Sequence, residues 1–227
     1  MSQSQTDQPS TVTPRLGNLA FRLVSSDWAS LALEVWRLLK KISAEEIIGL
    51  YEVLEFEHNL ELYDAHGHKA VFHKRATVCF LQDFVSAYQD QAWGLGNIFA
   101  DYKCSPGIPV DRYRDGRKYR VLISLRETKR RGEKMTISID RTVLDGFPNS
   151  IGWSETEIGH KTRRFFTSVT FPQSRPPKRA WLLQTNADHN ISLGPDNLGL
   201  LPDGRQRIFW ETKKPALFET YTLKWAW

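Results

Sequence analysis

The chain has 227 residues, 41% of them hydrophobic and 25% charged, which is an ordinary composition for a globular protein. A chain of this length buries roughly 70% of the surface of its unfolded form, so it needs no disulfide framework to fold. No apolar run approaches the ~20 residues of a membrane-spanning helix, and residues 1–15 contain no apolar core of a signal peptide. We therefore expect a cytoplasmic protein whose two cysteines, Cys79 and Cys104, are free thiols.

The net charge of +5 is unevenly distributed along the chain. Residues 51–111 carry a net charge of −5, whereas residues 112–150 carry +6. This asymmetry indicates either a basic face for an anionic partner or two faces that attract each other. Charges scattered over the solvent sides of strands are the third interpretation.

The N-terminal part is expected to contain a disordered tail (residues 1–15) followed by a helical segment (residues 16–50). Apolar residues recur there at steps of three and four, which predicts one apolar stripe on a helix. The stripe contains Trp28 and Trp36, and we expect both to dock the helix on the rest of the protein. Insertion of the same stripe into a membrane, as in pore-forming proteins, is the weaker alternative.

From residue 51 onward the apolar residues alternate with polar ones, which predicts strands. Leu54, Phe56, Leu60 and Leu62 mark the first strand, and Ala70 to Phe80 mark its return. Further strands are expected at residues 85–93, 98–102, 119–126, 135–143, 165–171, 180–184, 206–210 and 217–227. Because no helices alternate with these strands, residues 51–227 are expected to be mainly β, as an antiparallel β-sandwich. The sandwich is either one large body or two small ones divided near residues 148–152.

The last predicted strand has the clearest alternation. Leu217, Tyr221, Leu223, Trp225 and Trp227 share one parity, so they are expected on the buried face. Trp227 is the last residue of the sequence, and we expect its side chain to be partly solvated.

The sequence contains none of the common catalytic or phosphate-binding motifs. Carboxylates such as Asp90 and Asp140 are isolated, so the fold would have to assemble any catalytic pair. The histidines at 66, 68 and 73 and the two cysteines lack the spacing of a metal site. No catalytic residue, metal or cofactor is therefore assigned.

A basic loop is expected over residues 104–118, because Pro106 and Pro109 stiffen a segment that is rich in cations and aromatic residues. The next turn is also basic. The candidate binding residues of these two segments are Arg112, Tyr113, Arg114, Lys118, Lys129, Arg130 and Arg131. Clustered cations beside aromatic rings bind acidic proteins, phosphates or stacked bases.

These observations favour a non-catalytic binding or adaptor module that recognises a protein partner or an anionic ligand through this basic surface. The alternatives are a nucleic-acid-binding protein, a membrane-active protein and an enzyme whose site is invisible in the sequence. A second copy of the chain is also left open as a partner.

Overall fold

The computed structural model describes residues 49–227. The expected tail and all but the last two residues of the expected helical segment, including Trp28 and Trp36, lie outside the described residues. Residues 49–227 belong to one compact unit. In this part of the chain, no helix has the length and apolar character that crossing a bilayer requires.

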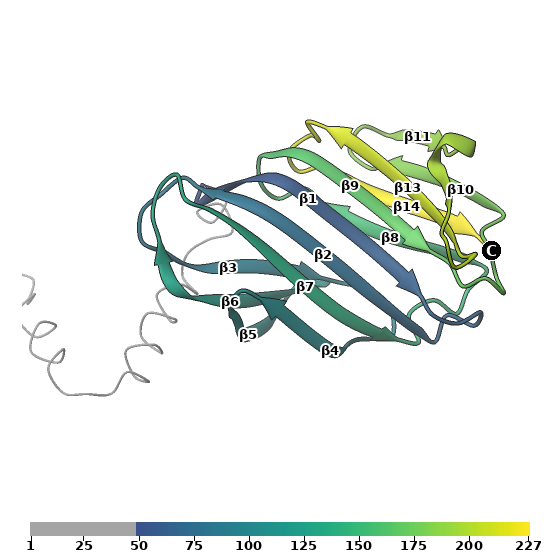
Figure 1. Cartoon of the computed structure of the whole chain (residues 1–227), viewed down its shortest axis with the longest axis horizontal. Helices are drawn as coiled ribbons and strands as arrows, with labels where there is room; N and C mark the ends of the chain where they lie inside the picture. Colours follow the sequence, from purple (N-terminus) through teal and green to yellow (C-terminus); the bar gives the residue numbers. More distant parts are fainter. Residues whose placement is uncertain (1–48) are drawn as a thin grey trace, which may run out of the picture. The chain divides into compact units, whose positions relative to one another are not determined.

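The described residues form fourteen strands and one short 3-10 helix (Figure 1). Their bounds are β1 (Tyr51–Leu62), β2 (Lys69–Phe80), β3 (Val85–Ala92), β4 (Asn97–Ser105), β5 (Ile108–Asp115), β6 (Lys118–Lys129), β7 (Lys134–Leu144), β8 (Ile151–Glu157), β9 (Thr162–Thr170), β10 (Arg179–Gln184), β11 (His189–Ser192), η2 (Pro195–Asn197), β12 (Leu198–Leu200), β13 (Gln206–Lys213) and β14 (Thr220–Ala226).

Three sheets build a sandwich, which confirms the mainly β, antiparallel fold expected from the sequence. Sheet A has seven strands in the order β12-β13-β9-β1-β2-β7-β4. Sheet B has the order β3-β6-β5 and sheet C the order β11-β10-β14-β8. Figure 1 shows the strands of sheets B and C behind those of sheet A. Together, sheets B and C form the second layer.

All strand pairs are antiparallel except β1 and β9, which are parallel. This pairing joins β9 and its neighbours to the strands that precede residue 148. Strands on both sides of the expected break at residues 148–152 therefore share one sheet.

The side chains between the layers form two apolar clusters. One cluster lies between sheets A and C and includes Leu60, Phe165 and Trp225. The other lies between sheets A and B and includes Val78 and Ile123. Each cluster uses the inward-facing positions of its strands, as the alternation of side chains across a sheet requires.

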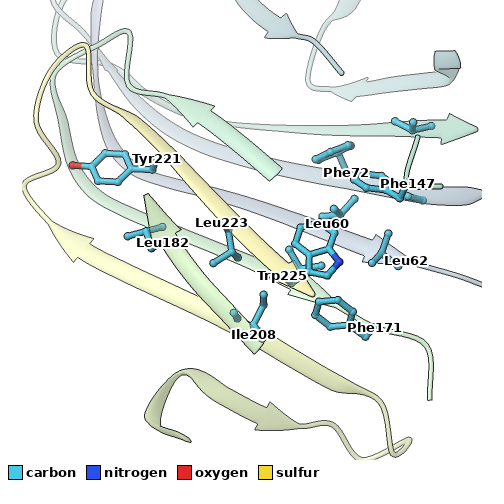
Figure 2. Packing of buried hydrophobic residues seen from close by; sticks show 14 of the residues in the cluster. Leu60, Leu62, Phe72, Phe147, Phe171, Leu182, Ile208, Tyr221, Leu223 and Trp225 are labelled. Carbon is cyan, nitrogen blue, oxygen red and sulfur yellow. The ribbon is translucent and has the colours of Figure 1, made fainter. Parts of the chain in front are cut away.

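The C-terminal strand has the burial that its sequence predicts. Tyr221, Leu223 and Trp225 of β14 are buried, and Figure 2 shows them among side chains of β1, β10 and β13. Leu217 precedes the strand and is exposed, so the expected strand begins three residues too early. Trp227 is only 5% exposed, and its indole N–H donates to the Asn149 carbonyl oxygen at 2.8 Å. The expectation of a partly solvated terminal side chain is therefore wrong.

Residues 104–118 differ from the expected loop, because they include an edge strand. Gly107 turns the chain from β4 into β5 with a φ of 100°, and a Cβ there would lie 2.6 Å from the Ser124 carbonyl oxygen. β5 then pairs with β6 along its length. Almost every side chain of β5 is exposed, so its sequence has no alternation by which a strand could be recognised.

Candidate functional site

A cavity of about 180 Å³ lies between the layers, where sheet B meets sheet C. Its walls come from the inner face of sheet A and from β3 and β8, the edge strands of the two smaller sheets. These two edges do not pair with each other within residues 49–227. The second layer is therefore discontinuous above the cavity.

The floor of the cavity is a row of polar side chains on the inner face of sheet A. His58 of β1 lies opposite Lys74 of β2, and Arg141 of β7 lies opposite Tyr102 of β4. Because Phe72 lies opposite Arg141, the cation and the ring are neighbours on one face. The row thus brings three basic side chains from consecutive strands of the sheet to the boundary between the two apolar clusters.

Lys74 is held by the second layer. Its Nζ lies 2.8 Å from Oδ1 of Asp90 on β3 and donates to the Gln91 carbonyl oxygen at 2.5 Å. The Tyr102 hydroxyl donates to the other oxygen of Asp90 at 3.0 Å. The side chains of Lys74 and Asp90 are only 11% and 4% exposed. Burial lowers the pKa of Lys74, while the charge of Asp90 opposes that shift.

Arg141 has no comparable partner. It is 3% exposed, and Nη1 donates to the Ile98 carbonyl oxygen at 3.0 Å. Its guanidinium lies 4.4 Å from the centre of the Phe72 ring, while Nε makes no hydrogen bond in the described part of the chain. Burial lowers the pKa of Arg141 to about 10 against the opposing charge of Asp90, so the group remains a cation at neutral pH.

His58 is buried beside these cations. Its Nδ1 is hydrogen-bonded to the Thr156 hydroxyl of β8, and its ring stacks on Phe72 with centroids 5.1 Å apart. Nε2 has no hydrogen-bond partner among the described residues. Burial lowers the pKa of His58 well below its usual value, and the charges of Lys74 and Arg141 lower it further. The imidazole is therefore neutral.

Two side-chain contacts beside the cavity connect the β3 and β6 side of the second layer to β8. The Trp93 indole N–H donates to Glu155 of β8 at 2.5 Å. Lys118, at the start of β6, forms an ion pair with Glu157, and its Nζ lies 5.1 Å from the centre of the Trp93 ring. These contacts connect the two sheets where backbone pairing is missing.

The structure separates the binding residues expected from the sequence into two groups. Arg112, Tyr113 and Arg114 lie on β5, close to Lys118 at the start of β6. Lys129 ends β6, and Arg130 and Arg131 follow it in the turn to β7. At ~3.3 Å per residue, the length of β6 places Lys118 and Lys129 roughly 35 Å apart. They do not form one surface.

Several of these cations already contact the protein itself. The guanidinium of Arg112 lies 4.4 Å from the centre of the Phe99 ring, and that of Arg114 lies 6.0 Å from the Tyr119 ring. Lys129 forms ion pairs with Glu127 and Glu133. Of the expected binding residues, Lys118 is the one whose ion-pair partner lines the cavity.

The sequence analysis did not identify the residues of the cavity floor as a site, although the sequence pattern indicates that they are buried. His58, Lys74, Asp90 and Arg141 all occupy inward positions of strands whose other inward residues are apolar. A charged residue at such a position is buried, and burial requires a partner or a ligand. This mismatch between polarity and position could have marked each residue individually, although not the fact that they lie together.

No three His, Cys, Asp or Glu side chains of residues 49–227 are placed to hold one metal ion. Cys79 and Cys104 are both free and partly buried. Burial raises the pKa of the Cys104 thiol, with a further contribution from the charge of Asp90.

No model of a known protein family matches the sequence, and no curated protein matches it. Among solved structures, an M1 zinc metallopeptidase from Deinococcus radiodurans is similar, with a TM-score of 0.44 and 13% sequence identity. The similarity covers 76% of this chain and 42% of that protein, so the chain spans less than half of its length. A likeness this remote carries no information about the function of the cavity.

The neutral His58 makes stability depend on pH in a defined direction. Its pKa in the folded protein lies below that of the unfolded chain, so below about pH 6.5 the unfolded state binds an extra proton. We therefore expect stability to fall on acidification from about pH 7 to about pH 5, with this group contributing up to ~1.4 kcal/mol per pH unit. Urea unfolding of the wild type and of His58→Gln at both pH values measures the contribution of His58 to this pH dependence. Equal pH slopes in the two proteins would contradict a neutral buried His58.

Proposed function

We propose that this β-sandwich is a binding module that holds a small anionic ligand in the cavity between β3 and β8. The proposal keeps the anionic ligand that the charge distribution suggested and moves its site from the basic surface to the interior. It rests on the combination of a cavity between the two layers and polar groups that lack partners among the described residues, which is typical of ligand sites.

The observation that carries the proposal is that the buried Arg141 guanidinium has no ion-pair partner, although the charge of Asp90 acts on it from a greater distance. No carboxylate of residues 49–227 lies within ion-pair distance of its guanidinium, although the side chain is almost completely buried. An ion removed from water without a counter-charge in direct contact costs several kcal/mol. An anion bound beside Arg141 offsets that cost.

Two further buried polar atoms of the same cavity support a bound anion. His58 Nε2 and Ser154 Oγ both lack hydrogen-bond partners among the described residues, and both residues line the cavity with Arg141. The Ser154 hydroxyl can donate to an anion, and so can Nε2 in the tautomer that carries its proton there. Buried polar atoms without partners are rare in folded proteins, so three around one cavity indicate a missing acceptor.

Thermal unfolding in acetate, compared with chloride at equal ionic strength, tests the proposal. A ligand that binds only the folded state at about 100 times its Kd adds about 2.7 kcal/mol of stability. For a chain of this size we expect the melting temperature to rise by roughly 5–10 °C.

Arg141→Met should fold, because apolar replacement of a buried ion is often neutral, and it should lose the acetate effect. Arg75→Met is the matched control, since Arg75 is exposed on the same sheet and the change in charge is equal. An equal acetate effect in all three proteins would show that the anion binds elsewhere, and no effect in the wild type would refute the proposal.

A further inference from the structure

The side chains that line the cavity indicate the chemical class of the ligand as well as its negative charge. Resting on the proposed function, we infer that the ligand is a monocarboxylate whose acid group is attached to a flat apolar body about the size of a benzene ring. The carboxylate binds at Arg141 and His58, and the apolar body lies against Phe72 and Phe147.

The charge of the buried groups calls for a monoanion. Lys74 and Arg141 are cations and Asp90 is an anion, while His58 is neutral, so the group has a net charge of +1. One negative charge neutralises it. A phosphate monoester, which carries nearly two negative charges at neutral pH, would leave an excess anion in the interior. The remaining charged groups of the lining balance each other, since Glu157 is paired with Lys118, and Arg120 and Glu155 carry opposite charges.

The bonding of the guanidinium favours a carboxylate over other monoanions. Nη1 of Arg141 is used by the Ile98 carbonyl oxygen, which leaves the edge formed by Nε and Nη2. This edge donates two parallel hydrogen bonds to the two oxygens of a carboxylate. Such a pair fixes the plane of the ligand as well as its position.

Apolar side chains continue from Arg141 along the inner face of sheet A. Phe72 lies opposite Arg141, and Val143 is the next inward residue of β7. Phe147 packs on Phe72 with ring centroids 6.4 Å apart, and all three residues line the cavity. The cavity therefore has an apolar part on the side of Arg141 that is remote from Lys74.

The size of the cavity fits a ring. Its volume is about 180 Å³, whereas an engineered apolar cavity of ~150 Å³ in another protein binds benzene. A phenyl group with one carboxylate is therefore of suitable size. A long acyl chain would need more volume than this space provides.

Isothermal titration of the full-length protein with four probes tests the inference. The probes are acetate, benzoate, phenyl phosphate and benzyl alcohol. Burial of the ring should make benzoate bind about ten- to a hundredfold more tightly than acetate. Phenyl phosphate and benzyl alcohol should bind at least about tenfold more weakly than benzoate, because one has excess charge and the other has none.

The outcomes separate this inference from the proposed function. Equal affinities for acetate and benzoate would overturn the flat apolar body and leave the anion site intact. Tighter binding of phenyl phosphate would overturn the monocarboxylate. Equal affinities for benzyl alcohol and benzoate would overturn both proposals. The same holds if Arg141→Met still binds acetate and benzoate as the wild type does, or if the wild type binds none of the probes.

Discussion

Trp225→Ala should lower the free energy of unfolding by about 3–5 kcal/mol, which is the usual cost of removing a large aromatic side chain from a core. The Trp225 side chain is 0% exposed and contacts the rings of Phe147 and Phe171. It also lies against the backbone of Gly152, where a Cβ would come within 2.3 Å of the indole. Since the free energy of unfolding of a domain is about 5–15 kcal/mol, urea unfolding followed by circular dichroism should show a large decrease in the midpoint urea concentration.

Trp181→Ala is the matched control for Trp225→Ala. Trp181 lies in β10 opposite Lys224 of β14 and is partly exposed, so its loss should cost clearly less. The loss of stability in Trp227→Ala should be closer to that in Trp225→Ala than to that in Trp181→Ala. Its indole is buried and hydrogen-bonded, and the Arg175 guanidinium lies 3.9 Å from the centre of its ring. If Trp181→Ala were the most destabilising of the three, the buried face of β14 would be wrongly assigned.

The class of fold was predictable because most strands expose one face and bury the other. The alternation in β2, β7 and β14 follows directly from that difference. β5 and β8 escaped prediction for different reasons. β5 is exposed along nearly its whole length, whereas the inward residues of β8 include Ser154 and Thr156, which do not contrast with their polar neighbours. A pattern of hydrophobicity cannot identify a strand without that contrast.

The candidate site was not predictable as a site, because its residues are distant in the sequence. His58, Lys74, Asp90 and Arg141 come from four strands, and their proximity depends on strand order and register. The basic residues that the sequence did emphasise are neighbours in the chain, yet β6 extends between them and separates them. Clustering in sequence predicts clustering in space poorly when a long strand lies within the cluster.

The buried ion pair of Lys74 with Asp90 should be the most sensitive polar contact of the sandwich. Lys74→Met leaves the Asp90 carboxylate in the interior with only the Tyr102 hydroxyl bonded to it. Breaking a buried pair from one side costs about 3–5 kcal/mol, because the remaining charge stays desolvated. We expect a loss of stability of that size in urea unfolding at neutral pH.

Lys103→Met supplies the matched control, since Lys103 and Asp101 form a pair of nearly the same length, 3.0 Å, with side chains that are 74% and 51% exposed. Its loss should cost less than about 1 kcal/mol, because water solvates both groups. Adding Asp90→Asn to Lys74→Met removes the stranded charge and should restore part of the lost stability, so the two changes are expected to be non-additive. Additive losses, or a Lys74→Met variant as stable as Lys103→Met, would mean that water reaches Asp90. The cavity would then be too wet for the charge of Arg141 to require a ligand.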